Sequence, residues 1–285
     1  MQHLFLDCSH GMSGDMTLAS LAHLGVDLSP LPGLLAQAGV ACRLEVWREE
    51  RGGGPGCRVE VSWEAEGQPL RLIALTLYHK NWLEDHYPGR FCFEQARDGF
   101  DYLYSVDRLA DLPGKKLHAK RNHIHRLDEA CPGWTWAPLT QADIPACLAM
   151  DAAWHQDALT RETVRGLSTL DDEHRALVLA LEHLPALGLE GIVLRWQDTL
   201  LGFTLGAPLT ETIFDVHFER ARGEIQGAYP AVNRSFARYI RQKYPHIRYL
   251  DREDDMGLPG LRKAKLSYAP DYLQVNFSAV ECRAP

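Results

Sequence analysis

The chain has 285 residues, of which 46% are hydrophobic and 24% are charged. This composition predicts a sizeable folded core and excludes wholesale disorder. A formal net charge of −8 excludes a generic binder of nucleic acid or anionic membranes. No apolar run approaches the roughly 18 residues of a membrane span, and the N-terminus lacks the basic and apolar regions of a secretory signal. We therefore expect a cytoplasmic protein.

The seven cysteines and thirteen histidines show no metal-binding spacing. No two cysteines lie within four residues of each other, and no HxxxH or HExxH pair occurs. The sequence therefore predicts reduced thiols and no metal site.

The first 76 residues predict a small β-α-α-β-β unit. Their elements, in chain order, are a strand at Leu4–Leu6, a helix at Met16–Leu24 that Asp15 caps, a helix from Ser29-Pro30 to Gly39, and strands at Leu44–Trp47 and Cys57–Trp63. We take residues 1–76 as one domain and residues 77–285 as a second.

The second domain alternates longer helices and strands. Strands are predicted at Phe100–Tyr104, Trp134–Leu139, Gly191–Arg195, Leu200–Pro208, Thr212–Phe218 and Ile247–Leu250. Helices are predicted at Leu112–Leu127, Ala142–His155, Leu170–Leu187 and Pro230–Lys243, with an irregular stretch at Thr160–Thr169. A helix crossing between the last two strands indicates an α/β (α+β) fold with a mixed sheet and flanking helices. This order resembles the GNAT acyltransferases.

A basic segment lies within the helix predicted at Leu112–Leu127. Its candidate substrate-binding residues are Lys116, Lys120, Arg121, Asn122 and His123. Such a cationic stripe can neutralise the phosphates of a nucleotide, a lipid head group or a tRNA acceptor stem. The alternative is a solvated helix face without a ligand.

A second polar segment, Asp251 to Lys265, follows the last predicted strand. Glu253 and Asp254 are candidate catalytic carboxylates, because a carboxylate can orient or deprotonate an amine. Arg262, Lys263 and Lys265 are candidates for holding a phosphate or a carboxylate. The alternative is a surface cluster of ion pairs that satisfy one another.

The stretch before the predicted crossover helix, Gly223 to Ala231, lacks the QxxGxG/A pattern with which GNAT enzymes hold the pyrophosphate of acyl-CoA. Pro230 also removes one backbone donor there. The sequence therefore does not indicate acyl-CoA as the donor.

Residues from about Leu77 to Phe277 resemble the family named for the C-terminal domain of phosphatidylglycerol lysyltransferase. The resemblance rests on His86–Phe91, Phe100–Tyr104, Gly114–Ile124, Arg252–Gly257 and Gly260–Tyr268. It implies a GNAT-like, Fem-related fold that transfers an amino acid from aminoacyl-tRNA to a lipid or to an amine or hydroxyl of a cell-envelope precursor, without a bound cofactor. It also implies that the site is lined by Arg121, Asn122, His123, Glu253, Asp254, Arg262 and Lys265.

Residues 1 to about 70 resemble the start of the nickel insertion proteins (the LarC family), which complete the nickel-pincer nucleotide cofactor with CTP. The resemblance rests on Leu6–Met16 and Leu24–Asp27. Because the histidine-rich remainder of that family is absent, neither nickel nor CTP is expected as a ligand. The sequence thus favours an acyltransferase, with two alternatives: a non-catalytic binding remnant of a truncated tandem-GNAT protein, and a nickel-pincer cofactor protein acting through its N-terminal fragment.

Overall fold

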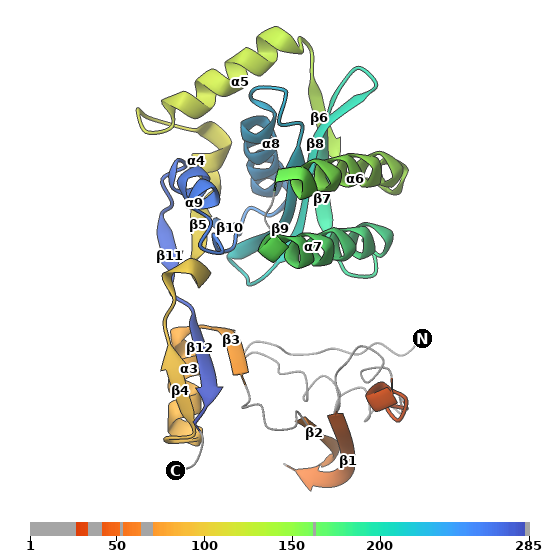
Figure 1. The fold of residues 1–285 in the computed structure, drawn as a ribbon, viewed down its shortest axis with the longest axis vertical. Helices are drawn as coiled ribbons and strands as arrows, with labels where there is room; N and C mark the ends of the chain where they lie inside the picture. The colour runs from red at the N-terminus through yellow and green to blue at the C-terminus, as the bar shows by residue number, and fades with distance from the viewer. Residues whose placement is uncertain (1–26, 34–41, 52–53, 64–70, 162–163, 283–285) are drawn as a thin grey trace. The chain divides into compact units, whose positions relative to one another are not determined.

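The computed structural model describes residues 27–33, 42–51, 54–63, 71–161 and 164–282 (Figure 1). The chain divides into two compact units, residues 1–70 with 281–285 and residues 71–280. The strand expected at Leu4–Leu6 and the helix expected at Met16–Leu24 lie outside the described residues. Of the helix expected from Ser29 to Gly39, residues 29–33 are described; 29–30 form a turn and 31–33 are helical.

In the first unit, β1 (Cys42–Arg51) and β2 (Gly54–Trp63) form an antiparallel pair. Cys42 lies opposite Trp63, and Arg51 lies opposite Gly54. The two strands predicted in this region are confirmed, and each is longer than its predicted range.

The second unit is built on a seven-stranded mixed sheet in the order β11-β5-β10-β9-β8-β7-β6. All neighbours are antiparallel except β9 and β10, which run parallel. The strands are β5 (Asp101–Ser105), β6 (Thr135–Pro138), β7 (Glu190–Trp196), β8 (Thr199–Pro208), β9 (Ile213–Ala221), β10 (Tyr249–Asp251) and β11 (Tyr272–Gln274). The predicted mixed α/β fold, with a helix crossing between parallel neighbours, is confirmed.

Helices cover both faces of this sheet, each over its own core (Figure 1). On one face lie α4 (Val106–Asp111), α5 (His118–Ala130) and the crossover helix α8 (Ala228–Lys243); on the other lie α6 (Ile144–Arg161) and α7 (Val164–Glu182). Side chains of β7 alternate between the cores, since Ile192 and Leu194 join the first and Val193 joins the second. The period of two along the strand therefore explains why both faces are apolar. Within the described part of the chain, no helix has the length and apolarity needed to cross a membrane.

A smaller sheet has the strand order β3-β12-β4. In the sequence, α3 (Leu77–His86) lies between β3 and β4. The strands of this sheet are β3 (Arg71–Leu75), β4 (Phe91–Glu94) and β12 (Phe277–Glu281). Cys92 and Cys282 each take part in a disulfide, whereas Cys131 and Cys147 are free and buried. The expectation of reduced thiols is therefore wrong for Cys92 and Cys282.

The helix predicted over Leu112–Leu127 is wrong at its start. Leu112 adopts a left-handed conformation (φ 50°) at the end of α4, and Gly114 follows with φ 76°. Pro113 lies between them, so the chain turns before α5 begins at His118. The irregular stretch predicted at Thr160–Thr169 is also wrong in part, because α7 begins at Val164. Beyond the last predicted strand the chain adds α9 (Pro259–Leu266), β11 and β12.

Candidate functional site

The parallel pair of β9 and β10 is short, and polar residues gather where it ends. The pairing runs from Ile213 opposite Tyr249 to Asp215 opposite Asp251. Beyond this point β9 continues along β8 alone to Ala221, through a register shift that places an extra residue in β9. The chain after Asp251 instead bonds to β5, with Arg252 N–H donating to the Tyr102 carbonyl. Residues of β9 after 215 and residues after 251 therefore flank the point where the two strands part.

Four carboxylates and one histidine meet on one side of this point: Asp101, Asp215, Asp251, Glu253 and His217. The Nδ1 atom of His217 lies 3.5 Å from Asp215 Oδ2 and 3.7 Å from Glu253 Oε1. Asp251 Oδ1 accepts a 2.9 Å hydrogen bond from the Glu253 N–H. Asp215 Oδ1 is buried and has no hydrogen-bond partner among the described residues.

The acidities of this group are perturbed by burial. Burial raises the pKa of Asp251 to about 7, helped by the neighbouring charge of Asp101. Burial also raises the pKa of Asp215 to about 6, helped by the charge of Glu253. The hydrogen bond to Glu253 raises the pKa of His217 against the opposing effect of its burial. The group thus holds two buried carboxyls whose pKa values lie near neutrality, beside a histidine whose pKa is also raised.

Glu253 is the accessible member of the group. Its side chain is 52% exposed, compared with 16% for Asp215. Ligand atoms of Asp215, His217 and Glu253 all lie within 4.8 Å of one another, close enough to hold a metal ion. The same separations are those of an imidazolium between two carboxylates, so we assign no metal here.

Cations and tyrosines lie on the other side of the strand divergence. Arg252 donates to Glu219 of β9 at 3.0 Å, and its guanidinium lies 5.2 Å from the ring centre of Tyr268 and 5.8 Å from that of Tyr104. The Lys120 ammonium lies 3.8 Å from the Tyr268 ring centre. Burial, followed by the charge of Arg252, lowers the pKa of Lys120 to about 8. A half-buried ammonium therefore stands beside a guanidinium at the edge of the site.

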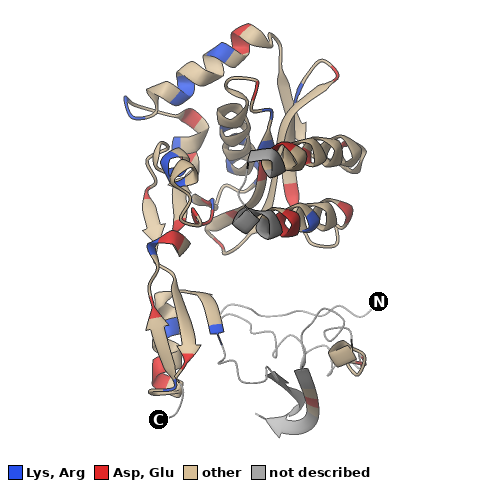
Figure 2. Ribbon diagram, viewed as in Figure 1, with Lys and Arg blue, Asp and Glu red and all other residues tan. Residues whose placement is uncertain are grey.

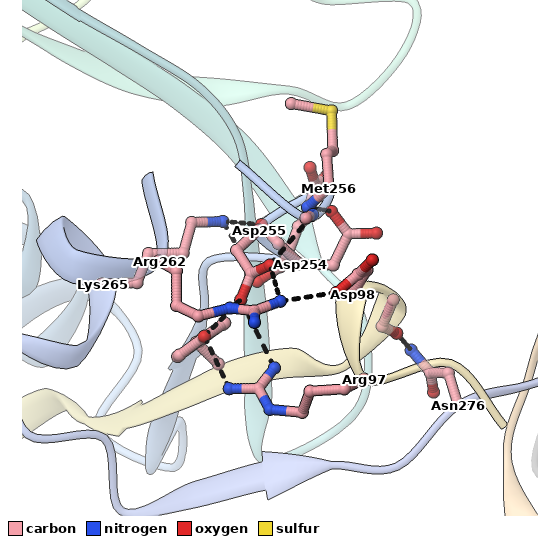
Figure 3. A network of polar contacts seen from close by, with 12 residues as sticks. Arg97, Asp98, Asp254, Asp255, Met256, Arg262, Lys265 and Asn276 are labelled. Atoms are coloured by element: carbon pink, nitrogen blue, oxygen red, sulfur yellow. Dashed lines mark hydrogen bonds and ion pairs between the residues drawn. The ribbon is translucent and has the colours of Figure 1, made fainter. Parts of the chain in front are cut away.

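The segment after β10 is held by internal polar contacts (Figure 3). The ammonium of Lys265, which is 8% exposed, donates to the backbone carbonyls of Arg252, Glu253 and Asp254. Glu253 has a positive φ of 54°, so these contacts hold a turn that an L-residue rarely adopts alone. Lys265 thereby fixes the backbone from which Glu253 projects toward His217.

A buried ion-pair network supports the same segment (Figure 3). Asp255 is fully buried and accepts from Arg262 Nε at 2.8 Å, Arg262 Nη2 at 2.7 Å and Arg97 Nη1 at 3.3 Å. Tyr102 donates its hydroxyl to Asp255, and Arg262 also contacts the exposed Asp98. The hydrogen bond from Arg262 holds the pKa of Asp255 well below its usual range.

The structure separates the residues predicted from the sequence into several environments. Glu253 lies in the carboxylate group, and the half-buried Asp254 accepts from the Met256 N–H at 3.0 Å. Arg262 and Lys265 have their donors engaged by the chain itself, and Lys263 is exposed. In the basic segment, the Lys120 ammonium lies over the ring of Tyr268, as does the guanidinium of Arg252.

The remaining residues predicted on the basic segment contact other parts of the chain or are exposed. Arg121 donates to the carbonyls of Leu112 and Gly114, and Asn122 contacts His118. His123 contacts Gln226, and Lys116 is exposed.

Sequence reasoning missed Asp101, Asp215, His217, Asp251 and Arg252 as site residues. One signal was present: polar Asp215 and His217 alternate with apolar residues along the strand predicted at Thr212–Phe218. The other members come together only through the pairing of β5 with β10, which no local pattern reveals.

Comparison with known proteins places the second unit in a family. The family model described as phosphatidylglycerol lysyltransferase, C-terminal, matches residues 71–280. A conserved protein of unknown function from Bacteroides thetaiotaomicron is 32% identical, with 83% of this chain and 82% of that chain covered and a TM-score of 0.67. The C-terminal domain of a proposed lysylphosphatidylglycerol synthetase from Agrobacterium fabrum shares the fold, at 14% identity over 75% of this chain and 68% of that chain, with a TM-score of 0.52.

A curated but uncharacterized protein from Mycoplasmoides gallisepticum is 22% identical over 212 residues, or 72% of this chain. The matched region spans 63% of that relative's length.

The N-terminal part matches a second model. The model described as nickel insertion protein matches residues 4–131, so it overlaps the first from residue 71 onward. A proposed nickel insertion protein from Syntrophobacter fumaroxidans is 40% identical over 72 residues, which is 25% of this chain and 18% of that protein. Both resemblances expected from the sequence are confirmed, but the second covers a minor part of the chain. Since the transferase model matches well over half of the residues, the chain belongs to the phosphatidylglycerol lysyltransferase C-terminal-domain family.

Proposed function

We propose that the chain is an aminoacyltransferase that moves an aminoacyl group from aminoacyl-tRNA to an amine or hydroxyl of a lipid or cell-envelope precursor. The observation that carries the proposal is the accessible Glu253 carboxylate paired with His217, at the end of a parallel strand pair in an acyltransferase-type domain. A carboxylate and an imidazolium side by side can accept one proton and supply another.

In the proposed reaction, the acceptor nitrogen or oxygen attacks the ester carbonyl carbon of the aminoacyl group. Glu253 accepts the proton that the acceptor loses. The carbon–oxygen bond to the terminal ribose breaks, and the ribose oxygen takes a proton from the imidazolium of His217. The hydrogen bond to Glu253, followed by the charge of Asp215, raises the pKa of His217 and so favours the protonated imidazole that this step needs.

The cationic side of the site supports a role in holding the donor. Arg262, Lys265 and Arg121, which the sequence suggested for this role, bond mainly to the chain itself. Lys120 makes no ion pair with any carboxylate in the described chain, and it lies beside Arg252. We assign to Lys120 the contact with a phosphate of the donor or with the developing oxyanion.

The start of α8 supports a donor other than coenzyme A. In its first turn, the Ala228 N–H donates to the Ile225 carbonyl and the Ala231 N–H to the Gly227 carbonyl, while Pro230 has no N–H. The carbonyl of His123 in α5 also packs against Gly227. Little backbone is thus available to receive a pyrophosphate at this helix end.

The substitution E253Q tests the assignment of the base. We expect label transfer from a pool of aminoacyl-tRNAs to fall by about 10²- to 10⁴-fold, because removal of a general base has effects of this size. E211Q, on an exposed turn before β9, serves as the matched control and should keep wild-type transfer. Equal transfer by the two variants would remove Glu253 from the mechanism.

A further inference from the structure

The outer side of α5 and the turn before it carry cations that the chain does not use. Lys115, Lys116 and Arg126 are exposed, and none of them forms an ion pair among the described residues. Their neighbours differ, because Arg121 turns inward to the carbonyls near Gly114 and Lys120 lies over Tyr268. The surface from Lys115 to Arg126 is thus a set of solvated charges without a structural role inside the chain. We call it the α5 basic surface.

The segment that carries this surface contains no acidic residue (Figure 2). No Asp or Glu occurs between Asp111 and Asp128. Asp128 accepts from the Trp134 indole at 2.7 Å, and Glu129 contacts His125 at 3.4 Å, both near the C-terminal end of α5. The cations therefore concentrate toward the N-terminal end of the helix.

This placement is unfavourable for the isolated helix. The N-terminal end of a helix already carries partial positive charge, and cations there cost about 0.3 to 1 kcal/mol each. The first turn of α5 has no side-chain cap and no acidic residue to offset that charge. An anionic partner would supply the compensation that the chain does not.

The apolar side of α5 excludes insertion into a bilayer. Leu117, just before the helix, and Ile124 are each 1% exposed, and Leu127 is fully buried. Helices that lie on a membrane bury an apolar face among the lipid tails, and α5 has already packed that face on the core. The basic surface is therefore suited to a hydrophilic polyanion rather than to a lipid surface.

We propose that the α5 basic surface binds the sugar-phosphate backbone of the base-paired acceptor stem of a tRNA. From His118 to Arg126 the helix rises about 12 Å, enough to follow several phosphates of one strand. Contacts of this kind fix position without reading sequence. Lys120, to which the proposed function assigns a contact with the donor, lies on the same helix. The choice of RNA as the polyanion rests on the proposed function.

The test measures binding of the full chain to fluorescently labelled, deacylated bulk tRNA at several salt concentrations. The triple variant K115E/K116E/R126E should bind at least about 30-fold more weakly than wild type, and its salt dependence of log K should be shallower by about 3. A control variant, R71E/R175E/R248E, makes the same change of charge at exposed positions outside α5 and should bind like wild type. Thermal unfolding of all three proteins verifies that they are folded.

Two results would overturn the proposal: equal loss of tRNA affinity in both triple variants, or no loss in either. A third would redirect it: loss of binding to phosphatidylglycerol vesicles, with tRNA binding unchanged, would make the surface a lipid-binding one. The aminoacyl-transfer assay separates this proposal from the proposed function. Binding of tRNA through α5 without transfer would refute the function alone. Transfer with an unchanged KM for tRNA in K115E/K116E/R126E would refute the surface alone.

Discussion

At the scale of single residues, burial sets the pKa values of the carboxyls in the site. Asp251 is 5% exposed and lies beside other acidic side chains, which is why its pKa rises to about 7. Glu253, two residues later, is half exposed and keeps contact with solvent. The same short segment thus supplies a buried carboxyl whose pKa is raised and a second carboxyl that solvent can reach.

The first prediction concerns Asp251 and pH. A carboxyl whose pKa is 3.8 in the unfolded chain and about 7 in the folded chain binds a proton more tightly when folded, so the free energy of unfolding falls as pH rises through that window. D251N removes this loss. We expect its melting temperature to exceed that of wild type at pH 8 by about 3 °C or more, with a smaller difference at pH 5. D198N, in an exposed turn, is the control. An unchanged pH dependence in D251N would contradict the assignment.

The second prediction concerns Asp255. D255N removes the charge that Arg262 and Arg97 share, and leaves two guanidinium groups facing a buried site. We expect a loss of at least about 2 kcal/mol in the free energy of unfolding, measured with urea. D98N removes an exposed partner of the same Arg262 and should cost less than about 1 kcal/mol. Similar losses of unfolding free energy in the two variants would contradict a larger stabilising contribution from the buried Asp255 than from the exposed Asp98.

At the scale of elements, the position of α5 depends on its contact with the start of α8. Gly227 has φ 94°, and a Cβ atom there would overlap the His123 carbonyl oxygen. This close approach lets α5 cover the first turn of the crossover helix. It also brings the basic segment to the same side of the sheet as Arg252 and Tyr268.

The third prediction follows from that contact. G227A should lower the free energy of unfolding by at least about 2 kcal/mol, because both the positive φ and the overlap with His123 oppose a side chain. At Gly223, four residues earlier, an added Cβ atom would meet no other atom within 4 Å, so G223A should have little effect. Urea unfolding of the two variants makes the comparison, and equal stability would contradict the packing described here.

Local patterns were sufficient for six of the seven strands of the large sheet, β5 to β10, and for its long helices. The strands predicted at Gly191–Arg195 and Leu200–Pro208 match β7 and β8 nearly to their ends. Local patterns failed where a break depends on backbone geometry, as at Leu112 to Gly114, although the Pro-Gly pair was a usable sign. They also failed for α9 and β11, which are short and stabilised by tertiary contacts.

The site was less accessible to prediction than the fold. Glu253 was identified because acids and bases crowd its segment, but that crowding also suggested Arg262 and Lys265 as ligand-binding residues. In the structure these two chiefly hold the segment itself. Asp215 and His217 reach Glu253 only through the parallel pairing of β9 with β10, two strands that are far apart in the sequence.

At the scale of the whole molecule, the chain matches two family models, of which the transferase model covers more residues. The second unit, residues 71–280, coincides with the range of the transferase family model. Within a chain whose net charge is −8, this unit carries a basic surface on α5 and an acidic group at the end of the β9–β10 pairing (Figure 2). This separation of charge suits a protein that holds a polyanionic donor on one side and activates an acceptor on the other.

The measurement that tests the central claim most directly offers the folded full chain two donors in parallel. One is a labelled pool of aminoacyl-tRNAs and the other is labelled acetyl-CoA, each with lipid and amine acceptors present. We predict that label moves from the tRNA, and that E253Q abolishes this transfer while E211Q does not. Transfer from acetyl-CoA alone would contradict the donor assignment. No transfer from either donor would identify the domain as a binding module without turnover.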